Sequence, residues 1–517
     1  MTKILLLTAR KVVVELDTWE KYETEKPYEI LVDGRTIVTS RVVETVEGLR
    51  PDTDYEMTIR YRGGQQTLRF HTAYESVTLN VRRMNARGDG VSDDTAAIQA
   101  AILACPEHGR VLIPVGRYSV KALFLKSNIT LEIEEGAVLL GNPDRNALPV
   151  LPGMVQQYDE TADYNLGSWE GNPLDCFAAM ITGVGVENVV VTGRGLLDGN
   201  ATEENWWEDD RAKIIAFRPR MVFLNRCRNV TIHGVTIQNS PSWTIHPYFS
   251  SDIKILCTAL RNPWDSPNTD GIDPESVDGL TVAGVYFSLG DDCVAIKSGK
   301  YYMGSTYGVA SRNIEVRHCY MHNGHGAVSI GSENSAGVYH VHVSSCVFDH
   351  TDRGCRIKTR RGRGKLAKIE DIRFENIDMD HVRTPIVINC FYNCCDPDRH
   401  SEYVRSKQPL PVDDRTPSVN QLAFRDLNCT NTHVAAAFIY GLPENPVDVA
   451  ELRNVKVRYT DEPIAMEPAM MDDIDEEATL IGGFFRNIRR LILDHVDIEG
   501  CRTEKIDAQG VEEMIRK

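Results

Sequence analysis

The chain has 517 residues, of which 42% are hydrophobic and 25% charged, and its formal net charge at pH 7 is -17. This length exceeds one ordinary domain, and the composition is that of a soluble globular protein. The acidic balance argues against a general nucleic-acid or membrane-surface binder, and no apolar run approaches the roughly 18 residues of a membrane span.

The N-terminus and the cysteines indicate the cellular compartment of the protein. The apolar run from Ile4 to Leu7 is too short for a signal peptide, and Arg10 and Lys11 follow it. The 13 cysteines are an odd number and several lie in apolar runs, which favours reduced core thiols over disulfides. Cys390, Cys394 and Cys395 are closely spaced but match no standard zinc pattern. We therefore expect a cytoplasmic protein without a metal or a cofactor.

Residues 1–76 predict a small β domain. Short alternating runs are separated by turn residues such as Asp33-Gly34 and Gly63-Gly64. The stretch from Leu49 to Tyr55 resembles the tyrosine corner of fibronectin type III sandwiches. We expect a fibronectin type III-like β-sandwich that serves as a packing or spacer module, with sugar binding as the alternative.

A helix is expected over residues 85–104. Gly88-Asp89-Gly90 predicts a turn, Ser92 or Asp93 could cap the helix, and the run from Thr95 to Leu103 has a small apolar face. Such a helix could close the open end of a repetitive structure, because end coils need caps.

From about residue 110 onward, short strand-like segments recur without long helices between them. The segments share paired β-branched residues and lie at residues 188–193, 229–235, 252–256, 278–282, 313–317, 340–343, 371–374, 449–452 and 489–494. This pattern favours a parallel β-solenoid over residues 77–517, with a series of sandwiches as the rival. The fold class is therefore all-β, with a solenoid after a small β-sandwich.

Three carboxylates fall one short repeat apart, Asp270 in one coil and Asp291-Asp292 in the next. Because successive coils lie roughly 4.8 Å apart, these side chains should become neighbours. Clustered carboxylates repel, so at least one should hold its proton to higher pH, which is the condition for acid and base roles. Calcium binding is the alternative for the same cluster. Gly290 could provide a kink that lets both aspartates reach the cleft.

Basic groups follow at similar intervals. His325 lies between two glycines, and Arg356 and Lys358 alternate around Ile357, which places both cations on one side of a strand. A turn histidine and a solvated loop are the ordinary interpretations of these residues. Their place in the series, together with Arg353, instead indicates a site for an anionic ligand.

These motifs together resemble the signature of the polygalacturonases, glycoside hydrolase family 28. They are Asn268-Thr269-Asp270, Gly290-Asp291-Asp292, Gly324-His325-Gly326 and Arg356-Ile357-Lys358. The resemblance implies a right-handed parallel β-helix that hydrolyses α-1,4-galacturonosyl linkages with inversion.

The resemblance also implies roles for individual residues. Asp291 would be the general acid, and Asp270 and Asp292 would hold and activate water. His325 would support the acid. The substrate-binding residues would be Arg356, Lys358, Tyr392, Asn268 and Arg353. In an inverting enzyme, acid and base carboxyls are expected roughly 6.5–9.5 Å apart.

The expected partner is a galacturonate-containing poly- or oligosaccharide. Rhamnogalacturonan or xylogalacturonan hydrolysis, a calcium-dependent pectate lyase and a non-catalytic β-helical carbohydrate binder are the alternatives. Two long insertions beside the site, Lys300 to Arg312 and Phe391 to Thr416, could close one end of the groove. We therefore expect exo-action at a chain end.

Overall fold

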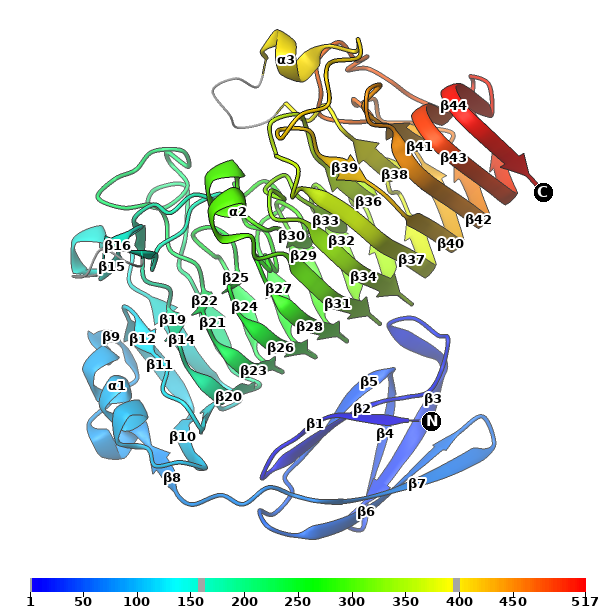
Figure 1. Ribbon diagram of the computed structural model, residues 1–517. Helices are drawn as coiled ribbons and strands as arrows, with labels where there is room; N and C mark the ends of the chain where they lie inside the picture. The colour runs from blue at the N-terminus through cyan, green and yellow to red at the C-terminus, as the bar shows by residue number, and fades with distance from the viewer. Residues whose placement is uncertain (1, 157–162, 394–399) are drawn as a thin grey trace.

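The computed structural model describes residues 2–156, 163–393 and 400–517. Most of the chain winds into a long stack of parallel strands, and a small domain of antiparallel strands lies beside the middle of that stack (Figure 1). The predicted parallel β-helix after a small β domain is therefore confirmed. None of the described helices is long and apolar enough to cross a membrane.

The N-terminal domain consists of two antiparallel sheets. One has the strand order β1-β2-β5 and the other the order β4-β3-β6-β7. Their bounds are β1 (Lys3–Leu7), β2 (Lys11–Glu15), β3 (Glu23–Val32), β4 (Arg35–Arg41), β5 (Val43–Glu47), β6 (Asp54–Tyr61) and β7 (Gly64–His71). Inward-facing residues such as Val14, Ile30 and Met57 form a core separate from that of the helix. The Tyr55 hydroxyl accepts a hydrogen bond from the backbone N–H of Arg50 at 2.8 Å, which ties one end of the domain together.

The β-helix has three strand ladders that each run along its length. The first ladder contains β8 (Thr78–Asn80), β10 (Gly109–Ile113), β13 (Ile129–Ile133), β20 (Glu187–Gly193), β23 (Arg228–His233), β26 (Ser251–Leu256), β28 (Asp278–Ala283), β31 (Ser311–Arg317), β34 (Val338–Ser344), β37 (Lys368–Asp380), β39 (Ser418–Val419), β40 (Leu422–Thr432) and β42 (Val447–Tyr459). The second contains β9 (Asp89–Asp93), β11 (Gly116–Val120), β14 (Ala137–Gly141), β21 (Leu196–Asp198), β24 (Thr236–Gln238), β27 (Ala259–Arg261), β29 (Tyr286–Leu289), β32 (Tyr320–Asn323) and β35 (Val347–Asp349). The strand-like segments expected from the sequence fall in the first ladder and its continuation in β43 (Ile481–Glu499).

The third ladder, called the groove face below, carries or adjoins the sequence motifs that contain Asp292, His325 and Arg356. It contains β12 (Leu123–Phe124), β19 (Ile181–Val184), β22 (Val222–Asn225), β25 (Ile245–Tyr248), β30 (Val294–Ile296), β33 (Val328–Ile330), β36 (Arg353–Lys358), β38 (Thr384–Asn389), β41 (Ala435–Tyr440), β43 (Ile481–Glu499) and β44 (Ile506–Arg516). A bridge from Ile245 to Ile272 and another from Ile272 to Val294 continue the ladder between β25 and β30. Aliphatic side chains from all three ladders fill one continuous core.

The first helix caps the N-terminal end of the stack but is shorter than expected. The α1 helix spans Thr95–Ala104, and its Ile98, Ala101 and Ile102 join the core of the β-helix. The expected start at residue 85 is wrong because residues 89–93 form β9 instead. The cap residue is Asp94, whose carboxylate accepts from the backbone N–H groups of Arg87 and Gly88 rather than from the helix. Neither Ser92 nor Asp93 is the cap.

The remaining short elements lie in the connections. They are η1 (Val81–Met84), η2 (Arg145–Ala147), β15 (Val150–Leu151), β16 (Val155–Gln156), β17 (Asp163–Tyr164), β18 (Cys176–Phe177), α2 (Tyr301–Tyr307) and α3 (Glu402–Arg405). The eleven cysteines of the described segments are free thiols, and most are buried. Of the cysteine cluster noted in the sequence, Cys394 and Cys395 lie outside the described residues.

The N-terminal domain is fixed to the helix by charged and apolar contacts. Glu15 accepts two hydrogen bonds from the Arg317 guanidinium, both at 2.9 Å. Val13 and Val43 pack against Leu256 in a small apolar cluster. The domain therefore binds the outside of the first ladder, away from the groove face.

Candidate active site

Strand register brings the sequence motifs together on the groove face. Ile272 pairs with Val294, Val294 with Val328, and Val328 with Cys355. Residues just before these positions therefore occupy neighbouring coils. Asp270 precedes the first and Asp292 the second, so the expected stacking of the aspartates is confirmed in position.

The three aspartates form one cluster. One carboxylate oxygen from each of Asp270, Asp291 and Asp292 lies within 4.8 Å of the other two. This proximity arises because Asp270 and the Asp291-Asp292 pair project from adjacent coils, whose strands are only about 4.8 Å apart. The expected separation of roughly 6.5–9.5 Å between the acid and base carboxyls stays a prediction.

Two glycines allow the close approach of these coils. A Cβ on Gly290 would lie 2.4 Å from the carbonyl oxygen of Ser266, so Gly290 is required by proximity to a neighbouring chain segment. Gly324 has a φ of +92°, a left-handed conformation that favours glycine, and a Cβ there would lie 2.4 Å from the carbonyl oxygen of Asp291. Gly290 before Asp291 and Gly324 before His325 are thus required because a larger residue would collide with a neighbouring backbone oxygen.

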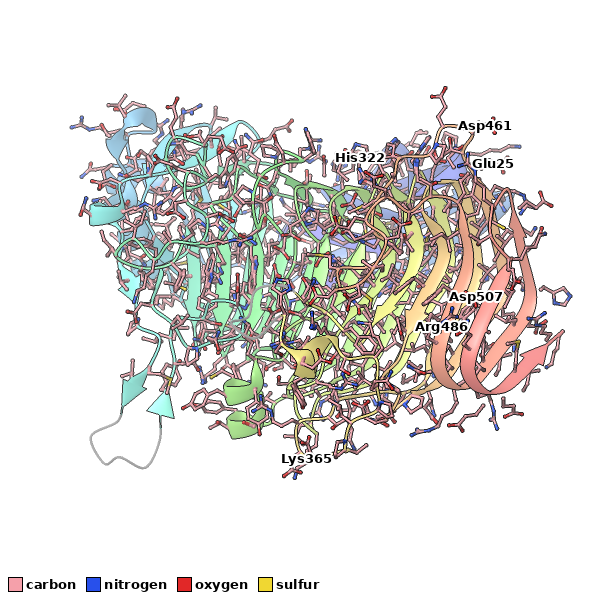
Figure 2. The ribbon with its side chains drawn as sticks, turned by 90° about the horizontal axis from the view of Figure 1, so that it is seen from above. Glu25, His322, Lys365, Asp461, Arg486 and Asp507 are labelled. Atoms are coloured by element: carbon pink, nitrogen blue, oxygen red, sulfur yellow. The ribbon has the colours of Figure 1, made fainter. Side chains whose placement is uncertain are left out.

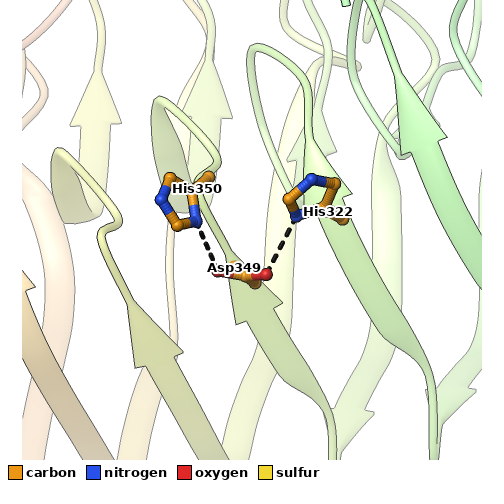
Figure 3. Close-up of side chains that lie close together, drawn as sticks. All are labelled: His322, Asp349 and His350. Atoms are coloured by element: carbon orange, nitrogen blue, oxygen red, sulfur yellow. Dashed lines mark hydrogen bonds and ion pairs between the residues drawn. The ribbon is translucent and has the colours of Figure 1, made fainter.

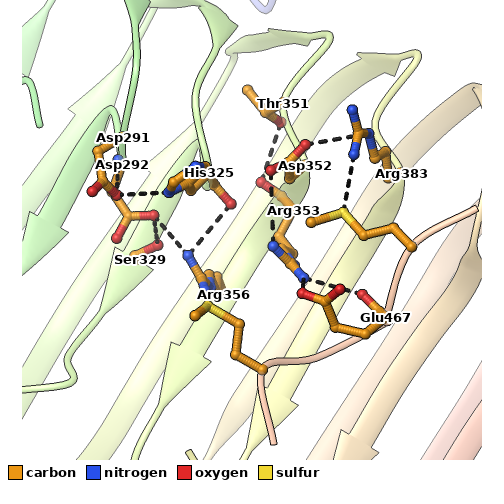
Figure 4. A network of polar contacts seen from close by, with 12 residues as sticks. Asp291, Asp292, His325, Ser329, Thr351, Asp352, Arg353, Arg356, Arg383 and Glu467 are labelled. Carbon is orange, nitrogen blue, oxygen red and sulfur yellow. Dashed lines mark hydrogen bonds and ion pairs between the residues drawn. The ribbon is translucent and has the colours of Figure 1, made fainter. Parts of the chain in front are cut away.

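Asp292 is held by cations from two coils further on. Its Oδ2 accepts from Lys358 Nζ at 2.6 Å, and its Oδ1 accepts from Arg356 at 3.0 Å and from the Ser329 hydroxyl at 2.8 Å. Burial opposes ionisation of Asp292, but Lys358 and then Arg356 outweigh it and lower its pKa far below the usual value. Asp292 is therefore a carboxylate at all ordinary pH values. Figure 4 shows the contacts of Asp292 with Ser329 and Arg356 beside His325.

Asp291 faces His325. The Nδ1 atom of His325 lies 3.2 Å from Oδ1 of Asp291, and half of the imidazole side chain is exposed. Burial would raise the pKa of Asp291, but the imidazolium charge and its hydrogen bond outweigh burial and lower that pKa. In turn, Asp291 raises the pKa of His325. Each member of the pair therefore favours the ionised form of the other.

Asp270 is the carboxyl that keeps its proton. Complete burial, followed by the charges of Asp273 and Asp291, raises the pKa of Asp270 well above its usual value. Its Oδ1 is buried and has no hydrogen-bond partner. Asp270 is thus the one of the three clustered aspartates whose surroundings favour the protonated form.

A second polar cluster, centred on Lys297, adjoins Asp270. Lys297 is buried, lies 3.4 Å from both Asp273 Oδ1 and Glu333 Oε2, and places its ammonium 4.5 Å from the centre of the Trp243 ring. Burial raises the pKa of Asp273 to about 7, although Lys297 opposes this effect. Lys297 therefore puts a buried positive charge beside Asp273, at the end of the strand that follows Asp292.

The predicted substrate-binding residues lie around the cluster. Asn268 accepts a hydrogen bond at 2.6 Å from Arg218. The buried Arg353 guanidinium donates to the Glu467 carboxylate at 2.8 Å and to its carbonyl at 3.0 Å. Tyr392 is buried, and its ring centre lies 5.7 Å from Lys358 Nζ. Of the three, Asn268 lines the cavity described below, whereas Arg353 and Tyr392 are buried.

The N-terminal end of the groove face is covered by residues 164–176, called the N-terminal cover. Asn165 donates to the Tyr248 hydroxyl at 2.5 Å, and the Ser168 carbonyl accepts from Arg220 at 2.9 Å. Trp169 stacks on Trp243 with ring centres 6.5 Å apart. The cover thus rests on β22 and β25 and on the residues flanking them.

The C-terminal side of the aspartate cluster is covered by residues 464–472, called the C-terminal cover. Glu467 binds Arg353, the Met470 sulfur accepts from Arg356 at 3.1 Å, and the Met470 carbonyl accepts from Asn389 at 2.9 Å. This segment therefore contacts β36 through Arg353 and Arg356 and β38 through Asn389, and Figure 4 shows Glu467 beside Arg353. Neither cover was predicted, because neither segment has a motif or periodicity.

The two insertions expected to form lids behave differently. Lys300 to Arg312 includes α2, and the Lys300 backbone N–H donates to the carbonyl of Gly171 in the N-terminal cover at 3.0 Å. Part of Phe391 to Thr416 lies outside the described residues. Its described part includes α3, where the carbonyl of Tyr403 accepts from Arg361 at 3.1 Å. The first insertion therefore supports the N-terminal cover.

A cavity of about 330 Å³ opens beside the cluster. The lining residues come from the turns that precede the groove face and are Trp264, Asp265, Ser266, Pro267, Asn268, Gly290, Asn323, Gly324, His325, His350, Asp352 and Arg383. A larger hollow of about 750 Å³ runs along the first ladder past Lys254, Glu315 and Arg373. It lies away from the carboxylates, so the smaller cavity is the one relevant to their chemistry.

The fold and this site define a parallel β-helix protein with a carboxylate and cation cluster on one face. The profile of Glycosyl hydrolases family 28 matches residues 131–439, and the chain belongs to this family. A second profile, Rhamnogalacturonase A/epimerase, pectate lyase-like, matches residues 78–182.

Individual relatives agree with this family assignment. A probable polygalacturonase of Vitis vinifera is 29% identical over 378 residues, covering 72% of each chain. An endo-polygalacturonase of Pectobacterium carotovorum subsp. carotovorum is 31% identical over 316 residues, covering 58% of this chain and 73% of the relative. The structure of a family 28 exopolygalacturonase from Yersinia enterocolitica superposes with a TM-score of 0.77 at 18% identity, covering 100% of this chain and 98% of that one. The last comparison concerns the fold alone.

Proposed function

We propose that this protein hydrolyses α-1,4-galacturonosyl linkages from a chain end, as an exo-acting polygalacturonase. The observation that carries the proposal is the cluster of Asp270, Asp291 and Asp292 held beside Lys358 and Arg356. Carboxylates supply the acid and base of glycoside hydrolysis, and the cations suit a substrate that carries a carboxylate on every sugar.

Asp291 is the proposed general acid, and Asp270 and Asp292 hold and activate the water. The reactive state needs the single carboxyl proton on Asp291, whereas the free site keeps it on Asp270. With the oxygens within 4.8 Å, one water molecule can relay the proton from Asp270 to Asp291. Asp270 then becomes the carboxylate that takes a proton from the attacking water, while Asp291 protonates the leaving oxygen.

His325 and the cations adjust this proton distribution. His325 stabilises ionised Asp291, so its imidazolium opposes the shift of the proton onto the acid. A galacturonate carboxylate near Lys358 and Arg356 would reduce their effect on the aspartates and favour the protonated acid. Substrate binding would thereby help to form the reactive state.

Exo-action is supported by the two covers. The N-terminal cover rests on β22 and β25, and the C-terminal cover binds Arg353 and Arg356. An internal segment of a polymer needs a groove open at both ends, whereas a chain terminus needs one entry. The exposed faces of His325 and Asp291 mark that entry.

The rival activities differ in what they require. A pectate lyase would depend on calcium, and a chelator would stop it but leave the hydrolase active. A non-catalytic binder would release no product. Rhamnogalacturonan or xylogalacturonan hydrolysis would appear as a preference for those polymers over polygalacturonate.

The decisive experiment compares viscosity with reducing ends during digestion of polygalacturonate. We expect reducing ends to accumulate while viscosity changes little, and chromatography to detect mono- or digalacturonate from the start. A rapid fall in viscosity at low bond cleavage would mean internal cutting and would overturn the exo assignment while leaving the hydrolase assignment intact.

We also propose that residues 1–76 form a fibronectin type III-like module and that residues 77–517 form the catalytic domain. The sheet orders β1-β2-β5 and β4-β3-β6-β7 and the hydrogen bond from Arg50 N–H to the Tyr55 hydroxyl support the module. The contact of Glu15 with Arg317 supports a spacer role. Proteolysis that releases a stable fragment beginning near residue 77 would support this division.

A cytoplasmic location is proposed on the basis of the thiols. Burial raises the pKa of Cys257 to about 12, and Cys390 likewise, which keeps these thiols protonated and unreactive. A reporter fusion recovered outside the cytoplasm would contradict this location.

A further inference from the structure

Three side chains with nitrogen and oxygen ligand atoms, His322, Asp349 and His350, form a cluster at the ends of β32 and β35. His322 lies in β32 and Asp349 at the end of β35, and the two positions pair directly in neighbouring coils. Nδ1 of His322 is 2.9 Å from Asp349 Oδ2, and Nδ1 of His350 is 2.5 Å from Asp349 Oδ1. Figure 3 shows both imidazoles turned toward the one carboxylate.

The surroundings fix this arrangement. The Tyr320 hydroxyl donates to Asp349 Oδ2 at 2.7 Å, and the His381 ring stacks on His350 with centres 4.5 Å apart. Burial would raise the pKa of Asp349, but the hydrogen bonds from Tyr320, His350 and His322 together lower it. An ionised carboxylate can only accept, so both imidazoles donate from Nδ1.

We propose that His322, Asp349 and His350 bind a divalent transition-metal ion such as Zn²⁺. One ligand atom from each residue lies within 4.8 Å of the other two. Two imidazoles and a carboxylate suit Zn²⁺, Ni²⁺ or Cu²⁺, whereas Ca²⁺ and Mg²⁺ prefer all-oxygen sites. The metal replaces the Nδ1 protons, and each neutral ring keeps its proton on Nε2.

The position of these ligands allows water to complete the coordination. The His322 side chain is 33% exposed and that of His350 is 51% exposed. Figure 2 shows His322 on one edge of the β-helix, opposite Lys365. His350 also lines the cavity shared with His325 and Asp352, so a bound ion would lie at the rim of that cavity.

The aspartate cluster is the other group in the described segments with ligand spacing. It offers carboxylates alone, and Lys358 and Arg356 already bind Asp292. A divalent ion there would meet the repulsion of these cations. In the histidine cluster, by contrast, the hydrogen bonds to Asp349 come from Tyr320, His322 and His350 and not from a lysine or arginine. Metal binding there does not depend on the hydrolase activity.

Calorimetric titration of ZnCl₂ into the full chain tests the proposal, with Co²⁺ absorption as a second readout. We expect one Zn²⁺ per chain, binding that Asp349→Asn and His350→Gln each weaken at least about tenfold, and little competition from excess Mg²⁺. The matched control is His340→Gln, since His340 Nδ1 lies 2.8 Å from Asp371 Oδ2 in a pair that contains a single histidine.

Three outcomes would overturn the proposal. These are no Zn²⁺ binding by the wild-type chain, unchanged binding by both Asp349→Asn and His350→Gln, and binding that is lost in Asp291→Asn but retained in those two variants. The last result would assign the ion to the aspartate cluster. Because His350 is half exposed, His350→Gln should fold even if Asp349→Asn does not, and circular dichroism checks this.

Discussion

Replacing Lys358 with methionine tests whether the buried cation pair stabilises Asp292. The Lys358 and Asp292 side chains are 9% and 1% exposed, and their charged atoms are 2.6 Å apart. Removing one partner of a buried pair costs about 3–5 kcal/mol, because the other charge is left unpaired. Arg356 still binds Asp292 Oδ1, so we expect the lower end, about 3 kcal/mol.

The chain offers a matched control in Lys365→Met. Lys365 lies 3.0 Å from Asp414, but these side chains are 66% and 77% exposed. Exposed pairs contribute about 0–1 kcal/mol. Both variants exchange the same cation for the same apolar side chain, so the comparison isolates burial.

The assay is guanidinium unfolding followed by tryptophan fluorescence, which reports mainly on the β-helix because Trp19 is the one tryptophan before residue 77. At pH 7 we expect a clear fall in the midpoint for Lys358→Met and almost none for Lys365→Met. The lowered pKa of Asp292 means that its stabilisation is present above the unfolded value of about 3.9 and is lost as pH falls below it. The difference in unfolding midpoint between Lys358→Met and wild type should therefore become smaller as the pH is lowered below about 3.9. Equal midpoints for both variants at pH 7 would refute the reasoning.

Three further predictions concern the reaction and its groove. The first product from an α-linked substrate should be the β anomer by NMR, and an α anomer would mean hydrolysis with retention instead. Glu467→Ala removes the carboxylate that binds Arg353, so the viscosity fall per reducing end should increase; an unchanged ratio would show that the C-terminal cover does not restrict entry. The raised pKa of His325 means that its ion pair with Asp291 stabilises below about pH 6.5 and is lost as pH rises through the raised value. His325→Gln should therefore be less stable than wild type at pH 5.5 but not at pH 9, and a gap that persists at pH 9 would contradict this.

The sequence was sufficient to predict the repeat and the residues that the repeat brings together. Strand register aligns Ile272, Val294, Val328 and Cys355, so the residues two before them, Asp270, Asp292, Gly326 and Arg353, lie on successive coils. Ser329 could have been found by the same reasoning, because it pairs directly with Arg356.

The covers could not be predicted in this way. Glu467 meets Arg353 across 114 residues of sequence, and the segment that carries it has no strand pattern. The start of α1 was also misjudged, because Asp94 binds the preceding backbone at Arg87 rather than extending the helix. Such contacts depend on how loops fold back on the stack, which local pattern does not encode.

Turnover by Asp291→Asn on a defined oligogalacturonide tests the central claim most directly. The amide keeps the size of the side chain but cannot deliver a proton, and general acid–base catalysis contributes about 10²–10⁴-fold. We expect turnover to fall by at least about 100-fold while calorimetry detects substrate binding close to that of wild type. Turnover within a few-fold of wild type would contradict the assignment of Asp291 as the acid.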